Sequence, residues 1–306
     1  MKASGMKTSL KNQVVWLTGA STGIGEALVP LLQKECAHVF ISARNAESLC
    51  AMAARFSNVT ALVADVTQPD SLKTAAAIIS SRFDHLDCLI ANAGTCEYVD
   101  VGHFDSALIE RVMRTNFMGL VYSVEAALPL LRKSARPRIA GVSSSVTALA
   151  MPRAEAYGAS KAASTHFLQS LRADLWAEGI QVSVISPGFV QTPLTDKNDF
   201  PMPARISAAQ AATAIVRGLN KGESDIHFPK RFTRLLRFIG WLPDVLRFRI
   251  VRAMARPGDA NAEPSGIRHA TSKRASVPSA SVPASPASAH ASASVTSTNH
   301  YGDSRS

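Results

Sequence analysis

The sequence predicts an α/β fold in which helices cover both faces of a doubly wound parallel sheet. Six short apolar runs, most of them rich in β-branched residues, alternate with longer segments in which apolar residues recur at helical spacing. The runs are apolar nearly throughout, as strands covered on both faces should be. A glycine-rich segment directly follows the first run, where this class of fold turns from strand to helix. One such domain accounts for most of the 306 residues.

The expected elements follow one another along the chain. The strands begin at Val14, Val39, Val59, Cys88, Ile139 and Val182, and a last strand spans Ile226 to Phe228. One face of a helix between the first two strands is formed by Ile24, Ala27, Leu28, Leu31 and Leu32, with Pro30 inside the segment. Later in the chain, Ser207 and Gln210 have the spacing of a capping box, which predicts that a helix begins there.

Four regions are expected along the chain. Residues 1–12 form an N-terminal arm, residues 13–228 the single doubly wound domain, residues 229–256 a basic amphipathic extension, and residues 257–306 a tail. The tail consists largely of Ser, Ala and Pro and has almost no large apolar residue to anchor it. We therefore expect it to be disordered.

Composition narrows the classes of function. With 46% hydrophobic and 18% charged residues, the chain can bury a sizeable core. The formal net charge of +10 suits an anionic ligand or membrane surface, but no basic and aromatic stripe, helix-turn-helix or zinc-finger spacing indicates nucleic acid. The four cysteines have neither a CxxC pair nor a histidine at ligand spacing, which predicts no metal site and no disulfide framework.

The sequence also bears on the cellular location. The first twelve residues contain lysines but no apolar stretch of the kind found in secretory signals. No run approaches the roughly 18 uninterrupted apolar residues of a membrane-spanning helix. We therefore expect a cytoplasmic protein.

The segment from Thr18 to Gly25, TGASTGIG, is the first candidate site. Glycines allow the backbone to turn sharply and to approach a pyrophosphate, whose charge is met by the free amides and the positive end of the following helix. The segment predicts a phosphate cradle, although a glycine-rich turn without a ligand has the same pattern.

The end of the second strand bears on the choice of cofactor. An acidic side chain there usually binds the ribose hydroxyls of NAD, whereas this chain has Ser42 and Arg44, and a cation can neutralise a ribose 2′-phosphate. We therefore expect NADP rather than NAD. The alternative is that Arg44 is an ordinary solvated charge.

Tyr157 and Lys161 form the second candidate site. They lie four residues apart in a segment of helical period, so both side chains emerge on one face. A phenol with an ordinary pKa of about 10 is a poor base at neutral pH, but a neighbouring ammonium favours the phenolate. The pair is a candidate proton carrier, although a Tyr and a Lys at this spacing are more often surface residues.

Taken together and in order, these motifs resemble the main single-domain branch of the short-chain dehydrogenase/reductase family, from about Val14 to Thr192. The resemblance implies a Rossmann fold and an NAD(P)-dependent transfer of hydride to or from a carbonyl or alcohol carbon. The catalytic residues that it implies are Asn116, Ser144, Tyr157 and Lys161. The cofactor-binding residues, with Ser42 and Arg44 added from the argument above, are Gly19, Ser21, Thr22, Gly23, Ile24, Gly25, Asp65, Val66, Asn92, Ala93, Gly94, Tyr157, Lys161, Pro187, Gly188, Val190 and Thr192.

The resemblance also assigns roles. Of three consecutive serines it selects the middle one, Ser144, as the donor to the substrate oxygen. Tyr157 transfers the proton, Lys161 stabilises the tyrosinate and binds the nicotinamide ribose, and Asn116 holds a water that links Lys161 to solvent. Asp65 contacts the adenine. Relatives are commonly dimers or tetramers, which implies a homo-oligomer.

Two later segments bear on substrate and partners. The region after Thr192, expected as a substrate lid, contains Leu194, Phe200, Pro201, Met202 and Pro203, which favours a lipophilic carbonyl or alcohol. Residues 229–256 interleave Arg and Lys with Phe, Leu, Ile and Trp, which suits peripheral contact with an anionic membrane. The alternative is that they cover the substrate cleft or pack against another subunit.

A non-catalytic NADP-binding scaffold that acts through its basic segment is the rival function. The complete set of four catalytic candidates favours an enzyme, because a scaffold has no need of them.

Overall fold

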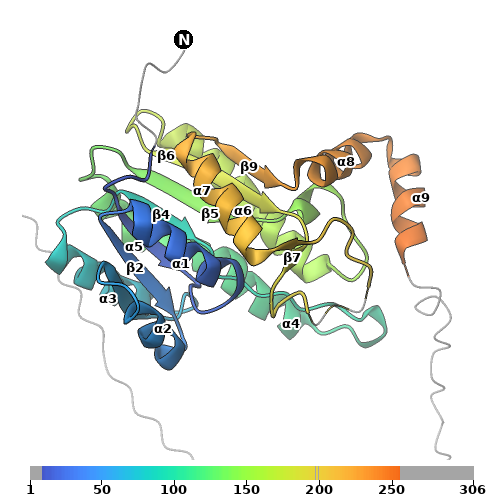
Figure 1. Ribbon diagram of the computed structural model, residues 1–306. Coiled ribbons are helices and arrows are strands. Elements are labelled where there is room, and N and C mark those ends of the chain that lie inside the picture. The colour runs from blue at the N-terminus through green and yellow to red at the C-terminus, as the bar shows by residue number, and fades with distance from the viewer. Residues whose placement is uncertain (1–8, 197, 199, 256–306) are drawn as a thin grey trace, which may run out of the picture. The chain divides into compact units, whose positions relative to one another are not determined.

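Seven parallel strands form the centre of the molecule in the computed structural model, which describes residues 9–196, 198 and 200–255 (Figure 1). The strands are β1 (Val14–Thr18), β2 (His38–Ala43), β3 (Val59–Val63), β4 (Cys88–Ala91), β5 (Arg138–Val142), β6 (Gln181–Pro187) and β9 (Asp225–Phe228). They lie in the order β3-β2-β1-β4-β5-β6-β9, and each neighbouring pair is parallel. The doubly wound sheet predicted from the alternating runs is confirmed.

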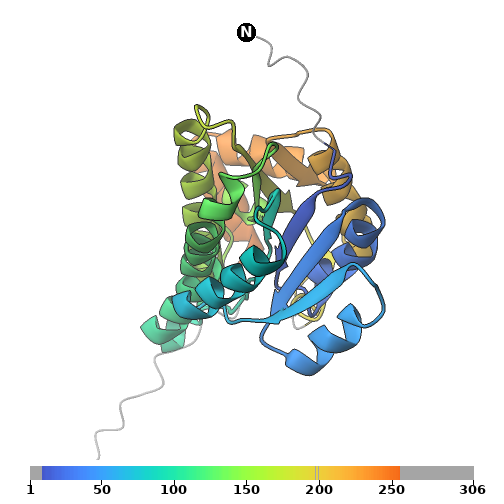
Figure 2. The ribbon, with the colours of Figure 1, turned by 90° about the vertical axis from the view of Figure 1, so that its left-hand side faces the viewer.

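Helices cover both faces of this sheet (Figure 2). The α-helices that connect its strands are α1 (Gly23–Glu35), α2 (Ala46–Ala53), α3 (Pro69–Arg82), α4 (Ser106–Met113), α5 (Gly119–Leu131), α6 (Glu155–Asp174) and α7 (Ala208–Asn220). On one face α1 and α7 lie side by side, and their apolar residues share a core with the strands. On the other face α3, α5 and α6 enclose a second core. Because both faces are covered, β1 is buried along its whole length.

Shorter elements follow several of the strands. A π-helical turn, η2 (Arg114–Met118), joins α4 to α5 without a break, and η1 (Val101–His103) and η3 (Ser145–Ala148) are 3₁₀ turns. After β6, the strand β7 (Val190–Gln191) pairs in parallel with β8 (Ile206–Ser207). The pairing fixes both ends of the segment between Gln191 and Ile206, and the residues that the sequence predicts as a substrate lid belong to this segment.

The extension predicted at 229–256 contains two helices, α8 (Lys230–Trp241) and α9 (Asp244–Met254), which follow β9 (Figure 1). None of the helices in the described residues is both long enough and apolar enough to cross a bilayer. The predicted tail, residues 257–306, lies outside the described part of the chain.

The predicted N-terminal arm, residues 1–12, does not end where we expected. Residues 1–8 lie outside the described part of the chain. Leu10, however, is fully buried in the core around α1, and its amide donates a hydrogen bond to Oδ1 of Asn220 at 2.8 Å. The domain therefore begins before residue 13, because an apolar side chain ahead of β1 fills a space between α1 and α7.

The predicted start of α7 is present in full. The amide of Gln210 donates to Oγ of Ser207 at 3.2 Å, and the amide of Ser207 donates to Oε1 of Gln210 at 3.0 Å. This reciprocal capping box satisfies two backbone amides that would otherwise lack a partner within the helix. The capping box also fixes the point at which the lid segment ends.

We expect the substitution Ser207→Ala to lower the free energy of unfolding by about 1 kcal/mol, because the cap of α7 is lost. Urea denaturation followed by circular dichroism measures the change. The control is Thr213→Ala, at an exposed position of the same helix, which should change stability by less than about 0.5 kcal/mol. Equal losses in the two variants would contradict the role assigned to the cap.

Candidate functional site

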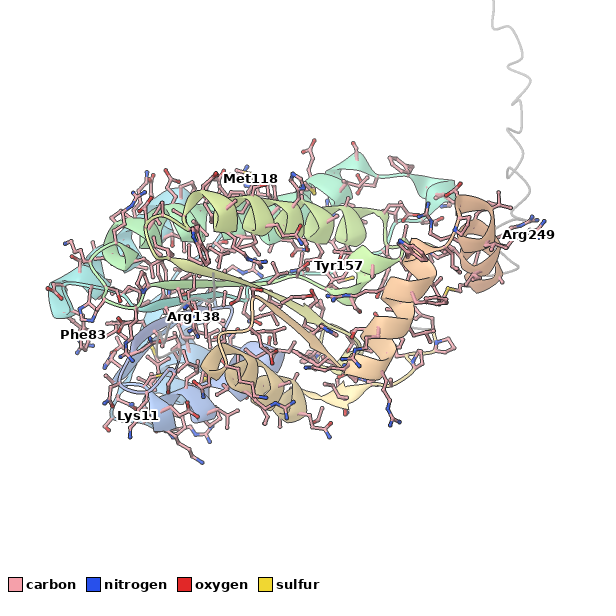
Figure 3. The ribbon with its side chains drawn as sticks, turned by 90° about the horizontal axis from the view of Figure 1, so that it is seen from above. Lys11, Phe83, Met118, Arg138, Tyr157 and Arg249 are labelled. Carbon is pink, nitrogen blue, oxygen red and sulfur yellow. The ribbon has the colours of Figure 1, made fainter. Side chains whose placement is uncertain are left out.

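The predicted site residues gather at the edge formed by the carboxyl ends of the strands. At the centre of the sheet β1 and β4 are neighbours, yet the chain leaves β1 for α1 on one face and leaves β4 for α5 on the other. Such a divergence opens the crevice in which doubly wound folds bind ligands. Figure 3 shows Tyr157 and Arg138, the first residue of β5, toward opposite ends of the sheet.

Two glycines with left-handed backbone shape the turn after β1. Gly19 has a φ of +66° and Gly23 a φ of +60°, which residues with a side chain rarely adopt. Nδ2 of Asn92, just after β4, donates to the carbonyl oxygens of Thr18 at 3.1 Å and Gly19 at 2.9 Å. A Cβ on Gly19 would lie 2.6 Å from Cα of Ala93. The turns after β1 and β4 are therefore held together, backbone against backbone.

The start of α1 fits a bound phosphate. A Cβ on Gly25 would overlap the carbonyl oxygen of Gly19, so the first turn of the helix lies directly against the glycine turn. Thr22 precedes the helix in an extended conformation, and its side chain does not cap it. The first amides of α1 thus have no partner in that side chain and are available to an anion. Ser21 and Ile24 lie in the same turn, so the structure brings the predicted cradle together.

The two residues predicted to bind the ribose phosphate differ in position. The end of β2 lies beside the glycine turn, since the amide of Ala20 donates to the carbonyl oxygen of Ser42 at 3.2 Å. The Ser42 hydroxyl is buried and accepts a hydrogen bond from Nε1 of Trp16 at 3.0 Å. Strand side chains alternate between faces, and position 42 shares the face of Trp16, so the Ser42 side chain belongs to the interior and not to the cofactor site. Arg44 is exposed.

Asp65 and Val66 follow β3 at the same edge of the sheet. Oδ1 of Asp65 accepts hydrogen bonds from the amide and the hydroxyl of Thr67, both at 2.9 Å. Val66 is buried against α5, where a Cβ on Gly119 would lie 2.8 Å from Cγ2 of Val66. These contacts hold Asp65 and Val66 in place just after β3.

The residues predicted after β6 reach back to the glycine turn. Pro187 ends β6, Gly188 follows it, and Val190 is buried in β7. Thr192 lies next to the first turn of α1, because a Cβ on Gly23 would lie 3.0 Å from Cγ2 of Thr192. The base of the lid therefore contacts the phosphate cradle.

Ser144, Tyr157 and Lys161 meet between β5 and α6. The side chains of Tyr157 and Ser144 are joined by a hydrogen bond. Nζ of Lys161 lies 5.9 Å from the centroid of the Tyr157 ring and donates to the carbonyl oxygen of Val142 at 2.9 Å. Lys161 is buried, whereas Tyr157 keeps some exposure. Lys161 is therefore the more deeply buried residue of the pair.

The three consecutive serines have different partners. Oγ of Ser143 donates to the carbonyl oxygen of Lys161 at 3.1 Å and lies 2.6 Å from Oγ1 of Thr165, so it anchors α6 to the sheet. Ser145 is buried in η3. Ser144 is the serine that bonds to Tyr157. The middle position, which the resemblance selects, is therefore the one that lies in the candidate active site.

Asn116 occupies the π-helical turn η2 and is buried. Its Oδ1 accepts from the amide of Thr95 at 2.7 Å, and its Nδ2 donates to the Thr95 carbonyl and to Oγ of Ser160, both at 2.9 Å. Gly94 fits between this amide and the active site, since a Cβ there would lie 3.1 Å from Oδ1 of Asn116 and 3.3 Å from Nζ of Lys161. The extra residue of a π turn, a feature often found at functional sites, places Asn116 beside the lysine.

The model of the family described as short chain dehydrogenase matches residues 13–201. The chain belongs to the short-chain dehydrogenase/reductase family. It is 31% identical over 234 residues to an uncharacterized oxidoreductase of Myxococcus xanthus, over 75% of this chain and 92% of that protein. It is also 31% identical over 278 residues to 11-beta-hydroxysteroid dehydrogenase A of Sesamum indicum, over 83% of this chain and 79% of that protein.

Among solved structures, this short-chain dehydrogenase/reductase is similar to the Pseudomonas aeruginosa RhlG/NADP active-site complex. The TM-score is 0.68 and the identity 26%, over 74% of this chain and 98% of that chain. The comparisons identify the protein as an oxidoreductase with a Rossmann-like fold and a nucleotide-binding site.

An aromatic cluster beside the catalytic residues of this short-chain dehydrogenase/reductase was not predicted. Tyr98 contacts Phe200, Phe200 contacts Phe189, and Phe189 contacts Phe232, with ring centroids 5.7, 6.1 and 5.6 Å apart. The four rings come from the segment after β4, the β6–β7 connection, the lid and α8. Of the four, sequence reasoning had selected Phe200 alone, because the others belong to no motif and meet through the topology.

Cys96 connects the aromatic cluster to the catalytic residues. Its thiol forms a hydrogen bond with Tyr98 and lies close enough to Lys161 and Tyr157 to interact with both electrostatically. Burial raises the pKa of this thiol, so it is neutral beside the catalytic pair. No sequence motif pointed to Cys96, although it follows the Asn92 to Gly94 segment by two residues.

Burial dominates the protonation of the catalytic pair. It raises the pKa of Tyr157 to about 12, and the hydrogen bond from Ser144 only partly opposes that shift. Burial also lowers the pKa of Lys161 to about 8. The expectation that the lysine brings the phenol toward neutrality is therefore wrong for these side chains by themselves, because desolvation disfavours both charged forms.

The shift at Lys161 predicts a pH dependence of stability. The pKa is lower in the folded protein than its ordinary value of 10.5, so the unfolded chain binds more protons between about pH 8 and 10.5. The free energy of unfolding should therefore rise relative to that of Lys161→Met as the pH is raised from 7 to 9.5, by about 2 kcal/mol. Denaturant titrations at each pH measure it.

The control for that measurement is Lys133→Met, at an exposed position. Its stability should follow that of the unsubstituted protein at every pH. If the stabilities of Lys161→Met and Lys133→Met depend on pH in the same way, burial of the Lys161 ammonium does not cause the predicted change in the free energy of unfolding.

Proposed function

We propose that the protein is an NADP-dependent oxidoreductase that transfers a hydride between the nicotinamide and the carbonyl or alcohol carbon of a lipophilic substrate. The observation that carries the proposal is the hydrogen-bonded Ser144 and Tyr157 pair, with Lys161 behind it, at the same edge of the sheet as the glycine turn. A hydride donor bound along that edge and a proton donor in α6 would act on adjacent atoms of one substrate.

Each catalytic side chain has its own role when the substrate is reduced. When bound, the nicotinamide cofactor supplies the hydride. Ser144 donates a hydrogen bond to the substrate oxygen and so stabilises the negative charge that develops there. Tyr157, which is protonated at neutral pH because burial raises its pKa, gives its proton to the same oxygen. Lys161, held by the carbonyl oxygen of Val142, supports the tyrosinate that results.

Asn116 supports this arrangement by positioning. Its amide binds Thr95 and Ser160, and Ser160 immediately precedes Lys161 in α6. The bonds hold the lysine helix against the segment that follows β4. The further role implied by the resemblance, retention of a water next to Lys161, stays a prediction.

The preference for NADP rests on Arg44. Its exposed guanidinium follows β2 beside the glycine turn, where it can form charge-assisted hydrogen bonds with a ribose 2′-phosphate. The similar RhlG structure is an NADP complex, which supports the same choice. Lys161 and the glycine turn do not discriminate between the two cofactors.

The preference for a lipophilic substrate rests on the aromatic cluster. Tyr98 lies close enough to Tyr157 to interact with it electrostatically, and the rings of Phe200, Phe189 and Phe232 extend the cluster from Tyr98. Apolar walls with a few polar groups at the reacting atom suit a substrate with a large hydrocarbon part. The similar protein of Sesamum indicum is a hydroxysteroid dehydrogenase by name, which supports this class of alcohol.

The scaffold alternative gains no support from the geometry, because all four catalytic candidates lie together. Assembly into a homo-dimer or homo-tetramer stays a prediction from the resemblance.

We expect Tyr157→Phe to lower kcat for NADPH-dependent reduction by about 10²- to 10⁴-fold while NADPH binding is retained, because the proton donor is removed and the cradle is untouched. Loss of NADPH absorbance with long-chain and cyclic ketones measures turnover, and cofactor fluorescence measures binding. The matched control is Tyr122→Phe, a partly buried tyrosine of α5. Normal turnover by Tyr157→Phe would refute the proposed reaction.

A second substitution tests the cofactor. Arg44→Ala should raise the Kd for NADPH by about 10- to 100-fold and leave the Kd for NADH unchanged, because one charge-assisted contact to the 2′-phosphate is lost. Arg217→Ala, an exposed arginine in the last turn of α7, is the control. An equal change in the Kd values for NADPH and NADH would show that Arg44 does not bind the 2′-phosphate.

A further inference from the structure

The helices α8 and α9 present two contrasting faces. The inner face of α8 is buried on the domain through Thr233 and Leu236. Phe232 of the same helix contacts Phe189 of the aromatic cluster. A Cβ on Gly240 would overlap the carbonyl oxygen of Ala148, so the end of α8 lies directly on the turn that Ser144 begins. The inner face of α8 is therefore packed against the domain.

The outer face of α8 is apolar and basic at once. Leu235, Phe238 and Trp241 are exposed there, and the exposed fraction of Trp241 is 84%. They follow one another at three-residue intervals, so they share one side of the helix. Arg231 and Arg234 are exposed among them. Large apolar side chains are rarely left in water in a contiguous group, so this face needs a partner.

The helix α9 likewise exposes both apolar and basic side chains. It is eleven residues long and has no buried residue. Isolated helices of this length are marginal in water, so the surface of a partner is needed to stabilise it. Its exposed apolar side chains are Val245, Leu246, Phe248, Ile250 and Met254.

The charge on this segment indicates the chemistry of the partner. Residues 230–255 contain seven lysines and arginines and one acidic residue, Asp244. Arg237 is paired with Asp225 and Arg247 with Asp244. In the described residues the other cations have no carboxylate partner: they are Lys230, Arg231, Arg234, Arg249 and Arg252. Figure 3 shows Arg249 projecting from α9 away from the sheet.

We propose that the exposed side chains of α8 and α9, named here the α8–α9 surface, dock on an anionic lipid bilayer. Aromatic and aliphatic side chains would enter the interface while the arginines bind lipid phosphates, as in other amphipathic helices that lie on membranes. A second copy of this chain is a poor occupant, because a two-fold contact would bring the unpaired arginines of two copies together.

Docking in this way places the active site near the lipid. Phe232 belongs to α8 and to the aromatic cluster, so only this helix would separate a bilayer on the outer face of α8 from the cluster. A lipophilic substrate could then enter from the membrane. This last step rests on the proposed function, whereas the docking itself does not.

The test is flotation of the full chain with vesicles of phosphatidylcholine alone and with phosphatidylserine added. We expect binding to the anionic vesicles only. Trp241→Ala/Phe248→Ala should weaken it by more than about tenfold, and Arg249→Gln/Arg252→Gln by roughly 30-fold. The controls are Trp176→Ala, an exposed tryptophan beyond α6, and Lys133→Gln/Arg217→Gln, which replaces two exposed cations elsewhere.

Three outcomes would overturn the proposal: no binding of the unsubstituted chain to anionic vesicles, equal losses in the variants and their controls, or self-association that disappears in Trp241→Ala/Phe248→Ala. The last would assign the surface to a second copy. Reduction of a water-soluble aldehyde by NADPH without vesicles should be unchanged in all the variants. Failure of docking and failure of the proposed reaction are therefore separate results.

Discussion

The catalytic arrangement depends on one buried carboxamide, that of Asn116. It uses both of its polar ends within the protein and so joins the segment after β4, the π turn before α5 and the helix α6. The first two lie in the connection between β4 and β5, and α6 follows β5, so without these bonds each could take a different distance from the glycine turn. A buried amide that makes all its bonds at once fixes their relative positions, because leaving any of them unmade is costly.

The fold could be read from the sequence because two periods, those of strand and helix, alternate with little interruption. Pro30 was a visible conflict, and α1 continues through it, as α5 does through Pro129. Tyr157 and Lys161 could be paired from the sequence because they are one turn apart on a helix, but that spacing alone also fits surface residues. Ser144 and Asn116 came only from the resemblance to the family. The features that the sequence did not reveal are contacts between residues far apart in the chain. The aromatic cluster joins residues from positions 98 to 232, and no local pattern reveals that Ser42 bonds to Trp16 across two strands.

The protonation of the pair was also misjudged from the sequence, for a physical reason. Spacing shows that an ammonium is near the phenol, but not how much water surrounds either group. In the folded protein desolvation is the largest influence on both groups, so that the pKa of Tyr157 is raised and that of Lys161 lowered. The site accordingly holds an acid that keeps its proton until a substrate oxygen becomes basic enough to take it.

The contact between Gly240 and Ala148 links the periphery of the molecule to its chemistry. Backbone rests on backbone there, with no side chain between them that could bend to absorb a movement. Close-packed interiors transmit displacement rather than dissipate it. A displacement of α8 would consequently be transmitted to the short turn that orients the Ser144 hydroxyl. The geometry at the reacting oxygen would then depend on the surface that contacts the outside of this helix.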